Sequence, residues 1–365
     1  MKVINTGRTF RITDNSLKTY DLLPAGVYTI RFSKMSGFFL EAHEPLVVKE
    51  DKIYGVHEEK VNKVLKSFDA FNRSLGVILS GDKGIGKSMF ARLLSIKAVS
   101  NNIPLIIVDE AIPGIASFIE DIQQEVVVLF DEFDKTFASS DKENNPQDGL
   151  LSLFDGISGG KKLYIITCNE IRRLNDYLIN RPGRFHYHFR FEYPNAEQIK
   201  EYLMDKLEEQ YYGEINNVIA FSRKVELNYD CLRAIAFEIN LGTSFAEAIK
   251  DLNIINVDAE KYDLTLHFTN GSPMTSRSKT IDLFERENFA CYLYDSQGRD
   301  IVRVEFNSAD AEYDPSVMGM VIKSDKLKLD YDEDFSEEIV AKAKALIPSF
   351  LIINRVKAKG LHYTV

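Results

Sequence analysis

The sequence has few cysteines and no long apolar run. The three cysteines, Cys168, Cys231 and Cys291, lie far apart and form no C-x-x-C pair, so we expect neither a zinc site nor a disulfide framework. This usage fits a reducing cytoplasm. Polar and charged residues interrupt residues 1–11, and no apolar stretch is long enough to cross a bilayer. We therefore expect a cytoplasmic protein without a signal peptide or a membrane span.

The chain also lacks an excess of positive charge. Its 45 Lys and Arg residues are outnumbered by 55 Asp and Glu residues, which gives a net charge of −10. Proteins bind nucleic-acid backbones mainly through clustered Lys and Arg, so this balance argues against a broad nucleic-acid surface, although a local basic channel is compatible with it. The length of 365 residues is sufficient for two or three domains with an ample core.

One stretch carries a complete phosphate-binding motif. Residues 81–88 have the sequence GDKGIGKS, which satisfies the pattern G-x-x-x-x-G-K-[ST]. Residues 77–80 before it predict a short buried strand, and residues 88–98 after it carry apolar side chains at helical spacing. The glycines allow backbone N–H groups to face phosphate oxygens at the positive end of that helix. Lys87 is predicted to reach the β- and γ-phosphates of ATP, and Ser88 to supply a hydroxyl ligand to Mg²⁺.

Strand and helix patterns alternate around this motif. Apolar strand patterns at residues 103–108, 125–130 and 163–167 are separated by helical segments, which predicts an α/β fold with a parallel sheet covered on both faces. Short alternating strands with turn residues dominate both ends of the chain. We predict a β-rich N-terminal domain at 1–50, a P-loop α/β nucleotide-binding domain at 51–193, a helical domain at 194–254 and a β-rich C-terminal domain at 255–365.

Polar residues follow two of these strands. Asp131 and Glu132 come directly after the strand pattern at 125–130, and Asn169 follows the next one. Neighbouring parallel strands bring their carboxyl ends to the same crevice, so we expect these side chains near the phosphate loop. Asp131 is predicted to hold Mg²⁺ through its water shell, and Glu132 to polarise the water that attacks the γ-phosphorus. Asn169 either holds this water, contacts the γ-phosphate or caps its strand, and Asp134 is interpreted as a solvated charge.

The segment at residues 171–185, with the sequence IRRLNDYLINRPGRF, resembles the part of AAA+ ATPases in which one or two arginines reach the nucleotide site of the neighbouring subunit. Together with the phosphate loop, Asp131-Glu132, Asn169 and the helices that follow, the resemblance covers roughly residues 53–254. The chain is most similar to the AAA clade, which includes membrane-bound AAA proteases and the mitochondrial translocase of the Rieske protein.

The resemblance implies a ring, commonly a hexamer, with ATP at each subunit junction. Arg181 and Arg184 would then stabilise charge on the γ-phosphoryl oxygens of the neighbouring site, unless one of the two pairs with a carboxylate of its own chain. Tyr54 and Gly55 match positions that wrap adenine in the family, although Tyr54 fits ordinary linker packing nearly as well. The predicted nucleotide-binding residues are Tyr54, Gly55, Gly81, Asp82, Lys83, Gly84, Ile85, Gly86, Lys87, Ser88 and Met89.

Three features depart from the family pattern or lie outside it. The third lid helix begins at residues 228–230 without a second sensor arginine. The loop at residues 111–115 has no aromatic residue with which to grip a threaded polypeptide, although Ile112 is able to line a pore. His186 and His188 share a strand face, but no third ligand lies nearby, so we interpret them as structural.

These features lead to one main hypothesis and two alternatives. We expect an AAA+ ATPase ring that couples Mg·ATP hydrolysis to remodelling, assembly or disassembly of a protein partner, which the terminal β-rich domains would select. The first alternative is a nucleic-acid-associated machine of the clamp-loader or helicase-loader type. The second is an assembly module that ATP binding switches, with slow turnover.

Overall fold

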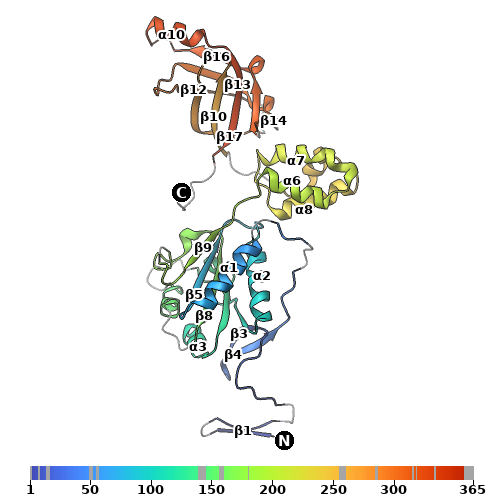
Figure 1. Cartoon of the computed structure of the whole chain (residues 1–365), viewed down its shortest axis with the longest axis vertical. Coiled ribbons are helices and arrows are strands. Elements are labelled where there is room, and N and C mark those ends of the chain that lie inside the picture. The colour runs from blue at the N-terminus through green and yellow to red at the C-terminus, as the bar shows by residue number, and fades with distance from the viewer. Residues whose placement is uncertain are drawn as a thin grey trace. The chain divides into compact units, whose positions relative to one another are not determined.

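The structure is a computed structural model of the whole chain. It describes residues 2–6, 9–13, 17–48, 52–54, 57–138, 145–155, 160–179, 181–254, 260–283, 287–314, 316–317, 319–332 and 334–356. Gly55, one of the two residues predicted to wrap adenine, lies outside the described residues. The chain divides into two compact units, Met1–Glu192 and Tyr193–Val365 (Figure 1). In these described parts, no helix is long and apolar enough to cross a membrane.

A seven-stranded sheet with the order β4-β3-β6-β7-β8-β5-β9 forms the centre of the first unit. Its strands are β3 (Val27–Ser33), β4 (Gly37–His43), β5 (Leu75–Ser80), β6 (Leu105–Val108), β7 (Val126–Phe130), β8 (Lys162–Cys168) and β9 (Tyr187–Arg190). The five strand pairs from β3 to β9 are all parallel, and only β4 runs antiparallel to its neighbour. The predicted α/β fold with a parallel sheet is therefore confirmed.

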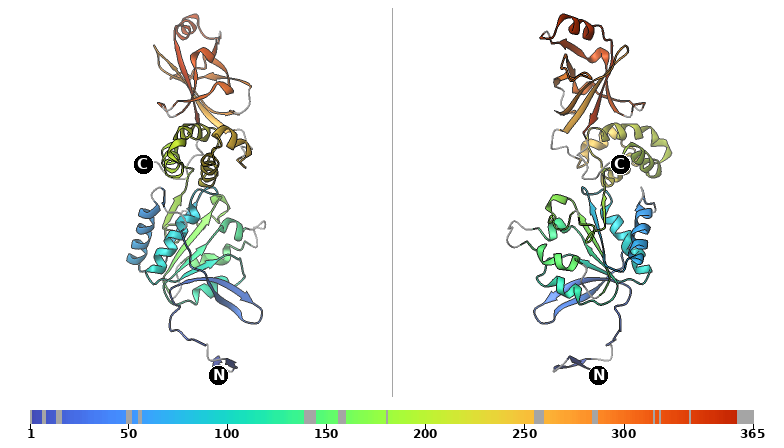
Figure 2. Two further views of the ribbon diagram at one scale, coloured as in Figure 1. Left: turned by 90° about the vertical axis from the view of Figure 1, so that its right-hand side faces the viewer. Right: turned by 60° about the vertical axis from the view of Figure 1, so that its left-hand side comes forward.

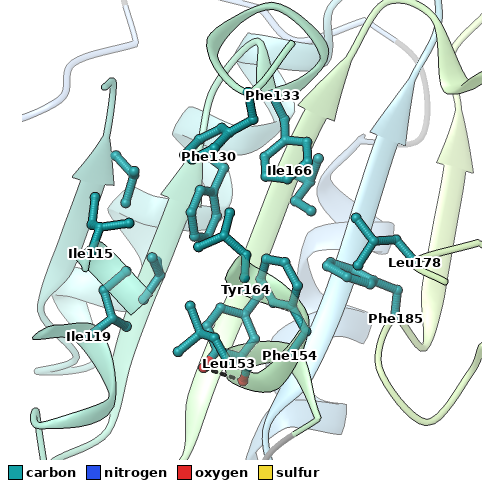
Figure 3. Close-up of a cluster of buried hydrophobic side chains, with 14 of the residues drawn as sticks. Ile115, Ile119, Phe130, Phe133, Leu153, Phe154, Tyr164, Ile166, Leu178 and Phe185 are labelled. Atoms are coloured by element: carbon teal, nitrogen blue, oxygen red, sulfur yellow. Dashed lines mark hydrogen bonds between the residues drawn. The ribbon is translucent and has the colours of Figure 1, made fainter. Parts of the chain in front are cut away.

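Helices cover both faces of this sheet (Figure 2). On one face α1 (His57–Ala70) and α2 (Lys87–Ser100) pack through Phe68, Phe90 and Leu94 onto the sheet. On the other face α3 (Ile115–Glu120) and α5 (Leu151–Phe154) pack around Phe130 and Tyr164 (Figure 3). Because both faces are covered, β5, β7 and β8 are buried at every position, which explains their nearly continuous apolar sequences.

The first 50 residues, which the sequence predicts to form a β-rich N-terminal domain, do contain β-strands. Two of these strands, β3 and β4, belong to the central sheet, where β3 pairs in parallel with β6. Ile30 on β3 is 1% exposed and packs in the same cluster as Ile106 and Ile115, so burial of this face drives the pairing. The hairpin of β1 (Lys2–Thr6) and β2 (Thr9–Thr13) forms a two-stranded sheet of its own.

The second unit combines a group of helices with a β-rich part. Its helices are α6 (Ala196–Lys206), α7 (Ile215–Ser222), α8 (Tyr229–Asn240) and α9 (Phe245–Asp251). Asn195 and Gln198 cap α6 by exchanging hydrogen bonds, and Asn228 caps α8. These caps satisfy backbone N–H groups that would otherwise lack a partner at the helix starts.

The β-rich part contains two antiparallel sheets around one apolar cluster. Its elements are β10 (Glu260–Phe268), β11 (Met274–Ile281), β12 (Asn288–Leu293), β13 (Val302–Asn307), β14 (Glu312–Asp314), β15 (Gly319–Lys323), β16 (Lys328–Tyr331), α10 (Glu337–Lys344) and β17 (Pro348–Arg355). Arg355 Nη1 lies 3.4 Å from Glu226 Oε1, and the Tyr262 hydroxyl donates to the Lys224 carbonyl. These contacts join the helices to the β-rich part. The four predicted domain boundaries as a set stay a prediction.

Candidate functional site

The phosphate-binding motif connects β5 to α2, as the sequence predicts. Gly81, Gly84 and Gly86 have φ angles of 137°, 73° and 102°, a backbone conformation that favours glycine. At Gly81 an added Cβ would also lie 2.5 Å from the carbonyl oxygen of Phe191. The loop thus needs glycine both for its conformation and for its close packing. It ends at the N-terminus of α2, where the helix dipole favours an anion.

Lys87 folds back over this loop. Its Nζ atom donates hydrogen bonds to the carbonyl oxygens of Gly81, at 2.6 Å, and Asp82, and to Asn169 Oδ1 at 3.0 Å. The residue is 7% exposed, and burial lowers the pKa of Lys87, while the neighbouring Cys168 and several acidic groups oppose this shift. Phosphate oxygens of a bound nucleotide would be stronger acceptors for this ammonium group than the loop carbonyls.

Asp131 and Glu132 stand at the carboxyl end of β7, and Thr167 on β8 holds both. The Thr167 hydroxyl donates to Asp131 Oδ1 at 2.6 Å and accepts the Glu132 N–H at 2.8 Å. Glu132 adopts a left-handed backbone with φ of 48°, which is strained for a residue other than glycine. No motif in the sequence singles out Thr167. Its hydroxyl, three positions after the buried Tyr164, fixes the two acidic residues relative to the neighbouring strand.

The Glu132 carboxylate is ionised and accessible to water. Its side chain is 51% exposed and forms an ion pair with Lys135. The hydrogen bond from Lys135 is the main cause that holds the pKa of Glu132 below its ordinary value, with smaller contributions from Lys83 and Lys87. A general base must be deprotonated at the working pH, and this carboxylate meets that condition.

Asn169 lies at the end of β8, beside Lys87. Its Oδ1 atom accepts the lysine hydrogen bond, whereas its Nδ2 atom is buried and has no hydrogen-bond partner within the described part of the chain. An unpaired buried amide costs about 1 to 3 kcal/mol, so a partner that completes it stabilises the site. A phosphate oxygen or an ordered water would be such a partner. The residues around Lys87 therefore fit a triphosphate.

Asp134 is not the solvated charge that the sequence predicts. It lies on the short helix α4 (Phe133–Thr136) and is 1% exposed. Its Oδ2 atom accepts the N–H groups of Asn169 at 3.1 Å and Glu170 at 3.0 Å. The neighbouring residues Phe133 and Phe137 are the sequence feature that indicates this burial. Both pack in the core, so the helix that carries Asp134 also lies against the core.

The two predicted arginine fingers have different surroundings. Arg184 binds Asp155 through two nitrogens and donates to the Tyr177 carbonyl at 2.9 Å, and its side chain is 10% exposed. Arg181 is exposed, and its guanidinium lies 5.2 Å from the centre of the Tyr177 ring. Among the described residues, no hydrogen bond or ion pair joins either arginine to the phosphate loop of its own chain.

The remaining predicted residues surround the loop or precede it. Ile85 is buried at 2% exposure, Met89 is half-buried, and Asp82, Lys83 and Ser88, the last in the first turn of α2, are exposed. Tyr54 is buried at 9% exposure, with the Lys52 ammonium 5.2 Å from its ring centre. His188 Nε2 lies 2.7 Å from Ser80 Oγ, at the residue before Gly81, so this histidine supports the loop from β9.

Comparison with known proteins gives one family match and several relatives. Residues 77–193 match the family described as "ATPase family associated with various cellular activities (AAA)". The proteasome-associated ATPase of Streptosporangium roseum is 28% identical over 172 residues, which are 36% of this chain and 28% of that protein. Those of Stackebrandtia nassauensis and Salinispora tropica are 36% and 37% identical over 84 and 82 residues, 21% of this chain and 14% of each relative. The similarity thus spans less than a third of these relatives.

Proposed function

This chain belongs to the AAA+ ATPases through its residues 77–193, and on this premise we propose that it hydrolyses Mg·ATP in a homo-oligomeric ring, commonly a hexamer in this family, to remodel a protein partner. One observation carries the proposal. Lys87 of the phosphate loop is hydrogen-bonded to Asn169, and the next strand of the sheet presents the ionised Glu132 at the same edge. Parallel strands deliver these groups to one crevice, which is where α/β sheets bind their ligands.

The phosphate loop would bind the triphosphate. Lys87 would exchange its bonds to loop carbonyls for bonds to β- and γ-phosphate oxygens. Ser88 and Asp131 would hold Mg²⁺, which neutralises charge on these phosphates. No group of three His, Cys, Asp or Glu side chains within the described ranges forms a metal cage. This fits a magnesium ion, which usually takes one or two protein ligands and completes its shell with phosphate and water.

Glu132 and Asn169 would act on the γ-phosphate. The Glu132 carboxylate would accept a hydrogen bond from water and orient its oxygen towards the γ-phosphorus. As the new P–O bond forms, the bond to the β,γ-bridging oxygen breaks and ADP leaves, while the water proton passes through Glu132 to solvent or to phosphate. The unpaired Nδ2 of Asn169 would donate to a γ-phosphoryl oxygen, which gathers charge in this step.

We assign Arg181 to the site of the neighbouring subunit. It is exposed and holds only a contact with the ring of Tyr177 among the described residues, so it is accessible to a partner. A trans-acting arginine of this kind contributes about 10³ to 10⁵ in rate. That Arg184 also acts on the neighbouring nucleotide site stays a prediction. For this role its ion pair with Asp155 would have to break.

A protein is the partner that the chain supports best. The relatives are named proteasome-associated ATPases, and the net charge of −10 disfavours a nucleic-acid partner. The β-rich regions at both ends would select this partner. The loop at residues 111–115, which lacks an aromatic residue, argues against an aromatic grip on a threaded chain.

The test is Glu132→Gln, with Glu170→Gln as the matched control. Both changes remove one exposed carboxylate charge, but Glu170 pairs with Arg173 at the surface. We expect Glu132→Gln to bind ATP as the unchanged protein does and to lose about 100-fold or more in turnover, because only water activation is lost. Glu170→Gln should keep turnover. Normal hydrolysis by Glu132→Gln, or no hydrolysis by the unchanged protein under any ring-forming condition, would contradict the proposal.

A further inference from the structure

A buried carboxylate outside the predicted catalytic set holds the end of β8. Asp134 Oδ2 accepts two consecutive backbone N–H groups, those of Asn169 and Glu170. Both bonds come from the segment that carries the Asn169 side chain, and the carboxylate itself is 1% exposed. Since Asp134 follows β7 and Asn169 follows β8, this contact ties the carboxyl ends of two neighbouring strands together.

The Asn169 amide is fixed from two sides. Its backbone N–H is bound to Asp134, and its Oδ1 atom accepts the Lys87 hydrogen bond at 3.0 Å. The amide nitrogen Nδ2 of this side chain still has N–H groups to donate. It is buried and has no hydrogen-bond partner among the described residues. With the backbone held by Asp134 and the oxygen held by Lys87, the two contacts together set the direction of Nδ2.

We propose that Asp134 is a positioning residue that aims the Asn169 amide at the γ-phosphate of bound ATP, an assignment that rests on the proposed ATPase function. Asp134 does not itself touch the nucleotide. Removing its carboxylate leaves two N–H groups without an acceptor and releases the strand end, so the Asn169 donor loses its place. A displacement of about 1 Å in such a group can lower a rate on the order of 100-fold.

A competing explanation is purely electrostatic. The negative charge of Asp134 also acts on Lys87, where it opposes the lowering of the lysine pKa by burial. The variant Asp134→Asn separates the two explanations, because a carboxamide oxygen can still accept both N–H groups while the charge is gone. Positioning predicts that Asp134→Asn keeps most of the activity that Asp134→Ala loses. An electrostatic role predicts that both variants lose it.

The experiment combines Asp134→Ala and Asp134→Asn with Asn169→Ala in the full chain. For each variant we would measure kcat, the affinities for ATP and ADP, and the thermal midpoint. We expect Asp134→Ala to lower kcat by about 10- to 100-fold and to lower ATP affinity relative to ADP, with ADP affinity unchanged. When Asn169→Ala is already present, adding Asp134→Ala should lower kcat by less than about threefold more, because the two residues act as one unit.

Gln147→Ala is the matched control. Gln147 is 2% exposed and tethers the neighbouring segment through hydrogen bonds with Phe137, Arg173 and Asn175, and among the described residues none of these bonds involves Asn169. It should lower the thermal midpoint as Asp134→Ala does, and its effect on kcat should be independent of Asn169→Ala. Independent, additive effects of Asp134→Ala and Asn169→Ala, or equal losses of ATP and ADP affinity, would overturn the inference.

The result also separates this inference from the proposed function. If the unchanged protein hydrolyses ATP and the two residues act independently, the inference fails alone. If the unchanged protein binds ATP without hydrolysing it, the proposed activity is wrong. The ratio of ATP affinity to ADP affinity in the variants then still tests whether Asp134 positions Asn169. Coupled losses in that ratio would support positioning by Asp134, and uncoupled or absent losses would overturn it.

Discussion

The guanidinium of Arg184 is bound through two of its nitrogens to the carboxylate of Asp155 in the same chain. Arg181, only three residues earlier, is exposed and lies against the ring of Tyr177. The two arginines of one short motif are therefore in different environments. Arg184 holds its own segment, and Arg181 is exposed and accessible to the neighbouring subunit of the proposed ring.

The first prediction separates the two arginines. Arg184→Ala should reduce the free energy of unfolding by about 1 to 2 kcal/mol, a value discounted because Asp155 is partly exposed. Arg181→Ala should leave stability unchanged and reduce ring ATPase activity by about 10³-fold. Denaturant unfolding and steady-state ATPase assays measure the two effects. If Arg184→Ala unfolds like the unchanged protein and loses activity as Arg181→Ala does, Arg184 is the finger that acts in trans.

The second prediction concerns Gly76 on β5. An added Cβ at Gly76 would overlap the carbonyl of Arg184 and approach the ring of Phe185 to 2.6 Å. Gly76→Ala should therefore push the arginine segment away and destabilise the fold by about 1 to 3 kcal/mol. Gly149→Ala is the control, since nothing lies within 4 Å of its Cβ. Equal thermal midpoints for both variants would contradict this prediction, because they would show that the arginine segment moves without loss of stability.

The third prediction follows from the pKa of Glu132. The hydrogen bond from Lys135 lowers this pKa, so Lys135→Ala should raise it towards its ordinary value of 4.5. A base works in its deprotonated form, and activity falls as the pH drops through its pKa. The acid limb of the kcat/KM profile should therefore move to higher pH in Lys135→Ala, with little change at pH 7. An acid limb that stays in place, or moves to lower pH, would contradict this assignment.

The fourth prediction concerns Cys168, which is buried beside Lys87. Burial raises the pKa of this thiol to about 12, and the thiolate is the reactive form. At pH 8 a maleimide should therefore modify the half-buried Cys231 before Cys168, and the ATPase should survive brief treatment. Peptide mass spectrometry of native and denatured samples gives the order. Rapid modification of Cys168 in the native chain would show that β8 opens at this end.

The sequence predicted those parts of the fold and of the site that depend on local patterns. The glycines of the phosphate loop, the acidic pair after β7 and Asn169 after β8 are each visible within a few residues. Their gathering follows from the general rule that parallel strands end at one edge. The structure brings Lys87 and Asn169 into contact, as this rule requires.

Other features depend on contacts between distant residues. The pairing of β3 with β6 joins Val27 to Leu105, and an alternating strand pattern does not identify its partner. Asp134 carries a charge that the sequence predicts to be solvated, yet two N–H groups at the end of β8 make its burial favourable. The pair of Arg184 with Asp155 likewise depends on a residue 29 positions away.

The most direct test of the proposed ring-forming ATPase is a mixing experiment with two variants that we expect to be inactive. Arg181→Ala keeps its own phosphate loop, and Lys87→Ala keeps its arginine, so a junction that combines the two intact halves is complete. Because one interface repeats around a closed ring, random mixing in equal amounts should produce this junction at about a quarter of positions. We predict that ATPase activity returns to roughly that fraction of the activity of the unchanged protein. Mixed rings that form and remain inactive at every ratio would contradict the account.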